Sequence, residues 1–220
     1  MIDAPLARPK AILFDWDSTL ADNWQAIHAA MNATLSAMGH ATWTIEQSRQ
    51  RIKSSLRDGF PTIFGENWRQ AMTIYRDAYT ASHLEHLREM PGAGAMLAAL
   101  HGSGLYLGVV SNKIGKYLRL EAGHLGWTGY FGRLVGAHDA QEDKPAVAPV
   151  ELALEGSGMA RGVEIWFVGD TDLDMRCAIN AGCTPVLMRM PPLSDGEFEH
   201  AMPACHVRDC PALARLVGQL

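Results

Sequence analysis

The chain has 220 residues, which is long enough to bury a substantial core, either as one domain or as a core with a smaller companion. Its net charge of −5, without any run of Lys and Arg, argues against a nucleic-acid-binding face. Hydrophobic residues make up 48%, as in ordinary globular proteins, and no apolar stretch reaches the length of a membrane span. We therefore expect neither nucleic acid nor a membrane as a partner.

The cysteine pattern bears on the redox compartment. Cys177, Cys183, Cys205 and Cys210 match no zinc motif, although the last two could form a disulfide in principle. The first five residues lack the basic region and the long apolar core of a signal peptide. We expect free thiols and a cytoplasmic protein.

A short apolar segment near the N-terminus ends in two carboxylates. Residues 11–14, Ala-Ile-Leu-Phe, run into Asp15 and Asp17. This pattern predicts a buried strand that ends at the carboxyl edge of a sheet, where open α/β folds bind ligands. Two such carboxylates need a cation or hydrogen-bond donors to offset the cost of burial. We expect a nucleophile, a proton-transfer group and part of a metal site here.

The following residues, 22–88, have helical periodicity and no convincing strand. Thr44 and Gln47 form a capping box at the start of one helix. Residues 54–65, which contain two glycines and a proline, predict a break with a single helical turn in it. The expected helices cover residues 24–38, 45–53 and 66–88.

From Pro91 onward, apolar strands alternate with helices. This alternation predicts βαβ units and a parallel sheet, hence an α/β fold. The expected strands cover residues 105–110, 134–136, 165–168 and 186–188. The expected helices cover residues 93–100, 116–124 and 147–155, with one more ending at Gly182 and a last one beginning at residues 209–211.

Polar residues follow several of these strands. Ser111 and Asn112 follow the second strand, Asp170 and Asp174 follow the strand near residue 168, and Lys144 precedes a helix. Because the carboxyl ends of parallel strands lie on one edge, we expect these side chains to converge with the two carboxylates of the first strand. Carboxylates with a bound phosphate suit Mg²⁺, and the hydroxyl, amide and ammonium groups suit an anion.

These positions carry a family resemblance. Residues 15–19, Asp-Trp-Asp-Ser-Thr, resemble the first motif, D-x-D-x-T, of the haloacid dehalogenase-like superfamily, and Ser111, Lys144 and the segment 169–174 resemble its second, third and fourth motifs. The helical block is similar to the C1-type cap of members such as phosphoglycolate phosphatases. The resemblance implies a Rossmann-like three-layer core with a parallel sheet, and an inserted all-α cap. Its expected boundaries are 1–21 and 89–220 for the core and 22–88 for the cap.

The resemblance also implies roles in catalysis. Asp15 would be the nucleophile that becomes an aspartyl phosphate, and Asp17 would protonate the leaving oxygen and then activate water. Ser111, Asn112 and Lys144 would hold the transferring phosphoryl group.

A Mg²⁺ ion is implied by the same resemblance. It would be held by Asp15, by the backbone carbonyl of Asp17 and by Asp170, with Asp174 supporting a metal-bound water. Thr171 and Asp174 also have the spacing of a capping box, so capping alone is the alternative for Asp174.

The substrate class depends on Asp17. An acid at this position suits an alkoxide leaving group, hence a phosphate ester hydrolysed by a phosphatase. A phosphosugar mutase and a non-catalytic binding protein on the same fold are alternatives. A signalling receiver domain, which is about half as long and has no helical insertion, is a weaker one.

Arg57 lies in the loop of the expected cap that faces the core in this kind of protein. It is our candidate for binding an anionic part of a small phosphorylated substrate. A surface ion pair with Asp58 or Glu66 is the alternative. The sequence indicates neither the particular metabolite nor the oligomeric state.

Overall fold

The computed structural model describes residues 6–52, 55–190 and 197–220. The chain divides into two compact units, of which the first comprises the residues up to Ala21 and Glu89–Leu220, and the second comprises Asp22–Arg88. In the described part of the chain, no helix is both long and apolar enough to cross a membrane. The four cysteines, which all lie in described segments, are free thiols.

The first unit is built on a sheet in the order β5-β4-β1-β6-β7-β8, whose neighbouring strands are parallel. Every residue of the central strand β1 is buried, which explains its uninterrupted apolar sequence. The described strands of this sheet are β1 (Ala11–Phe14), β4 (Tyr106–Ile114), β5 (Arg133–Ala137), β6 (Ile165–Gly169), β7 (Thr184–Met188) and β8 (Cys205–Val207).

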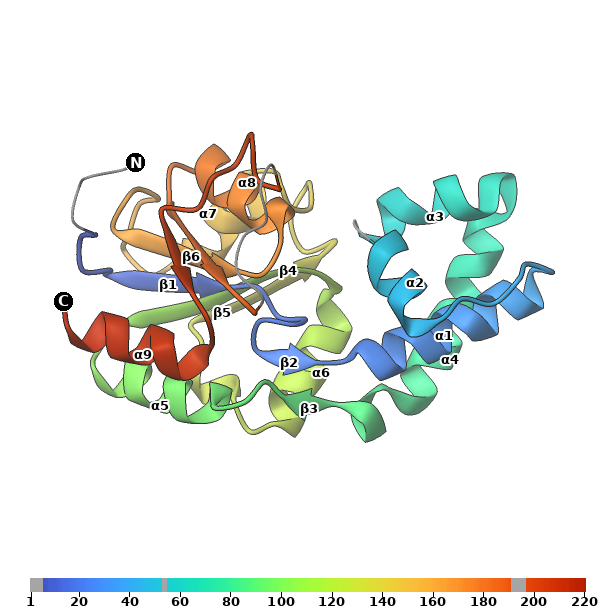
Figure 1. The fold of residues 1–220 in the computed structure, drawn as a ribbon, viewed down its shortest axis with the longest axis horizontal. Helices are drawn as coiled ribbons and strands as arrows, with labels where there is room; N and C mark the ends of the chain where they lie inside the picture. The colour runs from blue at the N-terminus through green and yellow to red at the C-terminus, as the bar shows by residue number, and fades with distance from the viewer. Residues whose placement is uncertain (1–5, 53–54, 191–196) are drawn as a thin grey trace. The chain divides into compact units, whose positions relative to one another are not determined.

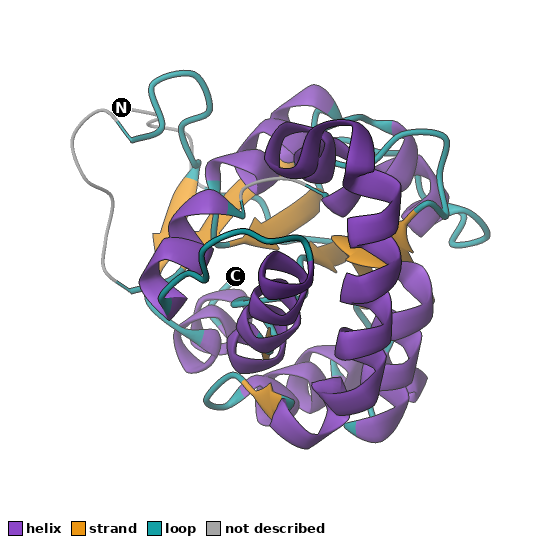
Figure 2. Ribbon diagram, turned by 90° about the vertical axis from the view of Figure 1, so that its right-hand side faces the viewer, coloured by secondary structure: helices purple, strands orange, loops and turns teal. Residues whose placement is uncertain are grey.

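Helices cover both faces of this sheet. Figure 1 shows α7 and α8 on one face and α5 and α9 on the other, and Figure 2 shows the strands between helices. The expected three-layer α/β core with a parallel sheet is thereby confirmed. The helices of this unit are α5 (Ala93–Gly102), α6 (Gly115–His124), η2 (Thr128–Tyr130), α7 (Ala148–Leu154), α8 (Asp172–Asn180) and α9 (Cys210–Gly218).

The predicted end of the second strand is wrong. We expected it to end at Val110, but β4 continues to Ile114. Its register against β5 shifts between Val110 and Ile114, so Ser111 and Asn112 lie within an irregular part of the strand. A bulge of this kind re-aims side chains without ending the pairing, and the polar residues that we interpreted as the end of the strand occupy it.

The second unit is mainly helical. Helix α4 packs mostly against α1 and α3. The chain passes between the two units twice, and a short strand lies at each of these points. The two short strands pair with each other. The elements are β2 (Ala21–Asp22), α1 (Trp24–Ala37), α2 (Ile45–Arg51), α3 (Leu56–Phe64), η1 (Gly65–Asn67), α4 (Trp68–His86) and β3 (Arg88–Glu89).

The capping box at the start of α2 is confirmed. The Gln47 N–H donates to Thr44 Oγ1 over 3.2 Å, and the Thr44 N–H donates to Gln47 Oε1 over 2.9 Å. The last expected residue of this helix, Lys53, lies outside the described residues.

The break expected at residues 54–65 is wrong, because α3 spans Leu56–Phe64 (Ser54 lies outside the described residues). Phe60 packs edge-on against Phe64 and Tyr75, with ring centroids 5.0 and 5.6 Å apart, and both phenylalanines are buried. An internal proline costs a helix about 3 kcal/mol, and burial of two aromatic side chains offsets a penalty of that size.

Candidate active site

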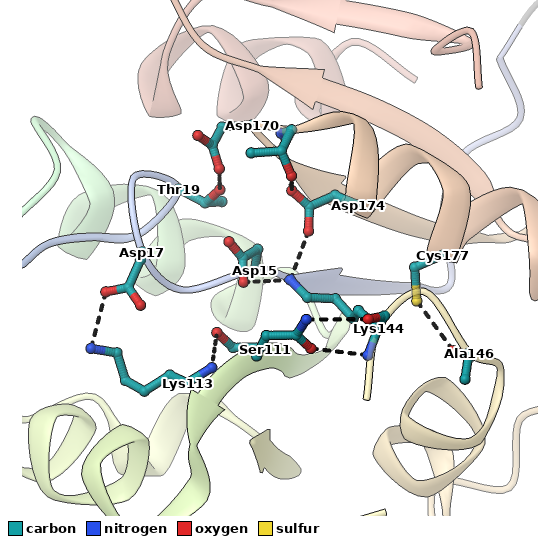
Figure 3. A network of polar contacts seen from close by, with 12 residues as sticks. Asp15, Asp17, Thr19, Ser111, Lys113, Lys144, Ala146, Asp170, Asp174 and Cys177 are labelled. Atoms are coloured by element: carbon teal, nitrogen blue, oxygen red, sulfur yellow. Dashed lines mark hydrogen bonds and ion pairs between the residues drawn. The ribbon is translucent and has the colours of Figure 1, made fainter. Parts of the chain in front are cut away.

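Side chains from three neighbouring strands and two loops gather at the carboxyl edge of the first unit's sheet (Figure 3). Asp15 directly follows β1, Ser111 lies in β4, and Asp170 directly follows β6. Asp15 and Ser111 are almost fully buried. The topology thus brings together residues that lie far apart in the sequence, as the parallel sheet predicts.

Lys144 lies at the centre of this cluster. Its Nζ lies 2.6 Å from Asp15 Oδ1 and 2.7 Å from Asp174 Oδ1, and its side chain is only 3% exposed. Burial alone would lower the pKa of this ammonium, but the carboxylates of Asp15 and Asp174 raise it well above its ordinary value. Lys144 is therefore a fixed positive charge next to Asp15.

Asp174 has a second set of partners at the start of α8. Its Oδ2 accepts the Thr171 N–H over 3.0 Å and the Thr171 hydroxyl over 2.6 Å. A Cβ on Gly169 would lie 2.4 Å from the Asp174 Cβ, so only glycine leaves room for this side chain. Asp174 therefore has both roles. Its Oδ2 caps the helix, and its Oδ1 contacts Lys144.

The carboxylates exceed the cations near Lys144. Asp15, Asp170 and Asp174 each offer an oxygen within 4.8 Å of the others'. Burial, reinforced by Asp174 and Asp17, raises the pKa of Asp15 to about 6 in spite of the lowering by Lys144. Burial and the nearby Asp174 and Asp15 carboxylates raise the pKa of Asp170 well above its usual range.

These raised pKa values provide a test of whether the residues fit a divalent cation. Two of the three carboxylates contact the ammonium of Lys144, and the third, Asp170, receives a long hydrogen bond, 3.4 Å, from the Thr19 hydroxyl. Carboxylate oxygens are the ligands that Mg²⁺ takes in proteins, and a divalent cation would relieve the repulsion that raises the two pKa values. The residues fit Mg²⁺.

Asp17 belongs to a different ion-pair group. Lys113 Nζ lies 3.0 Å from Asp17 Oδ1 and 3.1 Å from both carboxylate oxygens of Glu121. Glu121 is fully buried and accepts the indole N–H of Trp16 over 2.7 Å. Our sequence interpretation missed Lys113 and Glu121.

A signal for Glu121 was present in the sequence. It lies on the same helical face as Tyr117, Leu118 and Ala122, which are all buried. An acidic residue at a core-facing position is rare unless it has a partner, and that pattern could have pointed to a buried ion pair.

Asn112 fixes the loop that contains Lys144. Its Oδ1 accepts the Lys144 N–H over 2.9 Å, and its Nδ2 donates to the Lys144 carbonyl over 3.2 Å. Ser111 Oγ accepts the backbone N–H of Lys113 over 3.3 Å. Asn112 thus orients Lys144, and direct contact of Ser111 or Asn112 with a phosphate stays a prediction.

Arg57 lies in α3 of the second unit, whereas the other seven candidate residues lie in the first. In the alternative, Arg57 forms a surface ion pair with Asp58 or Glu66. Asp58 accepts the Ser55 hydroxyl over 2.8 Å. Binding of a substrate anion by Arg57 stays a prediction.

The class of protein follows from a comparison with known families. Residues 12–188 match the family model of the haloacid dehalogenase-like hydrolases, and the chain belongs to this family.

Several relatives share a more specific name. The chain is 32% identical over 180 residues to a phosphoglycolate phosphatase of Xylella fastidiosa strain 9a5c, covering 80% of this chain and 78% of the relative. It is 29% identical to a phosphoglycolate phosphatase of Aquifex aeolicus, covering 81% of this chain and 84% of the relative. The chain is thus similar to phosphoglycolate phosphatases.

Solved structures agree at the level of the fold. A crystal structure described as a predicted phosphatase from Clostridium acetobutylicum superimposes with a TM-score of 0.85 at 20% identity, over 97% of this chain and all of the other. A predicted phosphoglycolate phosphatase from Haemophilus somnus superimposes with a TM-score of 0.82 at 20% identity, over 96% and 99% of the two chains. At this identity, the likeness concerns the shared fold.

Proposed function

We propose that this protein is a Mg²⁺-dependent phosphatase of the cytoplasm that hydrolyses a monoester of a small phosphorylated metabolite through a phosphorylated aspartate. The observation that carries the proposal is the buried contact between Asp15 and Lys144, 2.6 Å long, beside the carboxylates of Asp170 and Asp174. A nucleophile, a fixed cation and a candidate metal site occupy the same few ångströms. The family and the named relatives support the same activity.

The first half of the reaction would form a bond to Asp15. An oxygen of the Asp15 carboxylate attacks phosphorus, and the bond between phosphorus and the ester oxygen breaks. The carboxyl group of Asp17 donates its proton to that leaving oxygen, so the alcohol departs neutral. Asp15 is then an acyl phosphate.

The second half would restore both residues. The carboxylate of Asp17 takes a proton from water, whose oxygen attacks phosphorus. The bond between phosphorus and the Asp15 oxygen breaks, which releases inorganic phosphate and the free Asp15 carboxylate. Asp17 is protonated again and ready for another substrate.

The remaining residues would hold the phosphoryl group and the metal. Lys144 and Ser111 bind phosphoryl oxygens, and Asn112 keeps Lys144 in place. Asp15, Asp170 and the backbone carbonyl of Asp17 would hold Mg²⁺, and Asp174 would support the metal site. When bound, Mg²⁺ offsets the repulsion between the carboxylates and the incoming phosphate.

The second unit would serve as a cap that excludes bulk water from the site. A cap favours small substrates over polymers, and Arg57 would bind a second anionic group of the substrate. Phosphoglycolate, which carries a carboxylate besides its phosphate, is the first substrate to test because the relatives are named for it.

Release of phosphate from p-nitrophenyl phosphate and from a panel of small phosphate monoesters, with and without Mg²⁺, tests the proposal. We expect Mg²⁺-dependent release that Asp15→Asn abolishes. Asp77→Asn, which changes an exposed carboxylate on α4, is the matched control and should retain activity. No release from any ester would contradict the proposal, and conversion of a sugar phosphate into its isomer without release would favour a mutase.

A further inference from the structure

We propose that Lys113 and Glu121 are positioning residues that hold the carboxyl group of Asp17 where it meets the leaving oxygen of the substrate. This inference rests on the proposed function, because it assigns a role within that reaction. It concerns two residues outside the four motifs that carry the family resemblance.

The contacts form a continuous buried chain within the first unit. Glu121 is fully buried and binds the Lys113 ammonium through both oxygens at 3.1 Å. The Lys113 side chain is 5% exposed and reaches Asp17 Oδ1 at 3.0 Å, whereas the Asp17 side chain is 23% exposed. Figure 3 shows the contact between Lys113 and Asp17, and Asp17, the more exposed end of the chain of contacts, is the residue that has to meet a substrate.

Glu121 also fixes the neighbour of Asp17 in the sequence. Its Oε2 accepts the indole N–H of Trp16 over 2.7 Å, and the Trp16 ring packs edge-on against Trp127, with centroids 5.8 Å apart. One buried carboxylate thus holds the Asp17 side chain through Lys113 and the adjacent backbone through Trp16. Two attachments restrict both the position and the rotamer of Asp17.

A role in general stability would not require this arrangement. Burying a carboxylate and an ammonium carries a desolvation cost, and hydrophobic residues of similar volume are often as stable or more stable. Precise placement is what a proton donor needs, because a misplacement of about 1 Å can lower a rate by roughly 100-fold. The buried ion pair supplies that placement.

The inference predicts a dependence on the leaving group. An alkoxide leaving group needs the proton of Asp17, whereas a dinitrophenolate leaves without one. Loss of positioning should therefore lower kcat/KM for alkyl phosphates and for poorly activated aryl phosphates, and spare 2,4-dinitrophenyl phosphate.

The experiment measures kcat/KM for a series of aryl phosphates and for one alkyl phosphate, in the wild type and in Lys113→Met. We expect a loss of roughly 100-fold on the alkyl phosphate and less than about threefold on the dinitrophenyl ester, hence a steeper dependence of log kcat/KM on the pKa of the leaving group. Lys10→Met, which removes a lysine from an exposed pair with Glu164, should leave the dependence unchanged.

Two further variants keep the test decisive. Glu121→Gln should steepen the same dependence, and if it does not fold, Lys113→Met carries the test alone. In an Asp17→Asn background, Lys113→Met should add little further loss, because the residue through which it acts is already disabled.

The outcomes separate the two proposals. A wild type that is inactive on every ester contradicts the proposed function itself. An active wild type whose Lys113→Met variant loses the same factor on every ester overturns the positioning role, since Lys113 would then act on the phosphoryl group or on folding.

Discussion

The ammonium of Lys144 lies 2.6 Å from Oδ1 of Asp15, although 129 positions separate the two residues in the chain. Both side chains are nearly buried, so water screens the contact poorly. Asp15 nevertheless has a raised pKa, because burial and its neighbouring carboxylates outweigh the lysine. Around this contact, the carboxylates thus still outnumber the positive charges.

Removal of that lysine should affect both activity and stability. We expect Lys144→Met to lower kcat/KM by at least about 100-fold, because a fixed charge at the phosphoryl group is lost. Its loss should also reduce the free energy of unfolding by about 3–5 kcal/mol, because buried carboxylates remain unpaired. Kinetics and urea unfolding measure the two effects. Lys10→Met is the control for a charge lost at the surface, and equal behaviour of the two variants would contradict the role of Lys144.

Binding of Mg²⁺ should stabilise the folded protein. At a concentration 100 times its Kd, a ligand adds about 2.7 kcal/mol, which corresponds to a rise in Tm of roughly 5–10 °C for a chain of this size. We expect this rise in the wild type and its loss in Asp170→Asn. Asp172→Asn, in which a half-buried carboxylate paired with Arg176 is changed, should retain it. An unchanged rise in Asp170→Asn would exclude Asp170 as a ligand.

The two contacts of Asp174 can be separated by an asparagine. Asp174→Asn keeps an acceptor oxygen for Thr171 but removes the charge that faces Lys144. We expect a smaller Mg²⁺-induced rise in Tm together with lower activity. If Asp174 serves only as a helix cap, the variant should show the full rise, measured in the same thermal scan as the wild type.

Gly169 should tolerate no side chain. In Gly169→Ala, the new Cβ would lie 2.4 Å from the Asp174 Cβ, so α8 or the strand has to move. We expect a loss of about 1–3 kcal/mol in the free energy of unfolding, together with lower activity. Gly162→Ala is the matched control, because nothing lies within 4 Å of its Cβ position. Equal stability of the two variants would refute the close packing at Gly169.

Arg57 should affect substrate binding more than turnover. If its guanidinium binds a second anionic group, Arg57→Ala should raise KM for phosphoglycolate about tenfold or more and leave p-nitrophenyl phosphate nearly unchanged. Arg69→Ala, on α4 with its guanidinium over Trp68, is the control. Equal losses on both substrates would contradict the binding of a substrate anion by Arg57.

Local sequence patterns predicted the core of the fold. The apolar run of β1, the alternation after Pro91 and the Thr44 capping box each depend on near neighbours in the chain, and each is found in the structure. Where packing with distant residues decides, the same patterns fail. Helix α3 forms despite Pro61 because Phe60 packs against Tyr75 of another helix.

The sequence by itself determined the parallel α/β core and, through its motifs, the resemblance to the family, because periodicity and motif spacing are properties of the chain alone. Only the tertiary structure decided how the candidate site residues pair. Lys144 binds Asp15 and Asp174, whereas Asp17 binds Lys113. An ion pair depends on distances of a few ångströms between segments far apart in the chain, and these distances exist only once the sheet has brought its carboxyl ends to one edge.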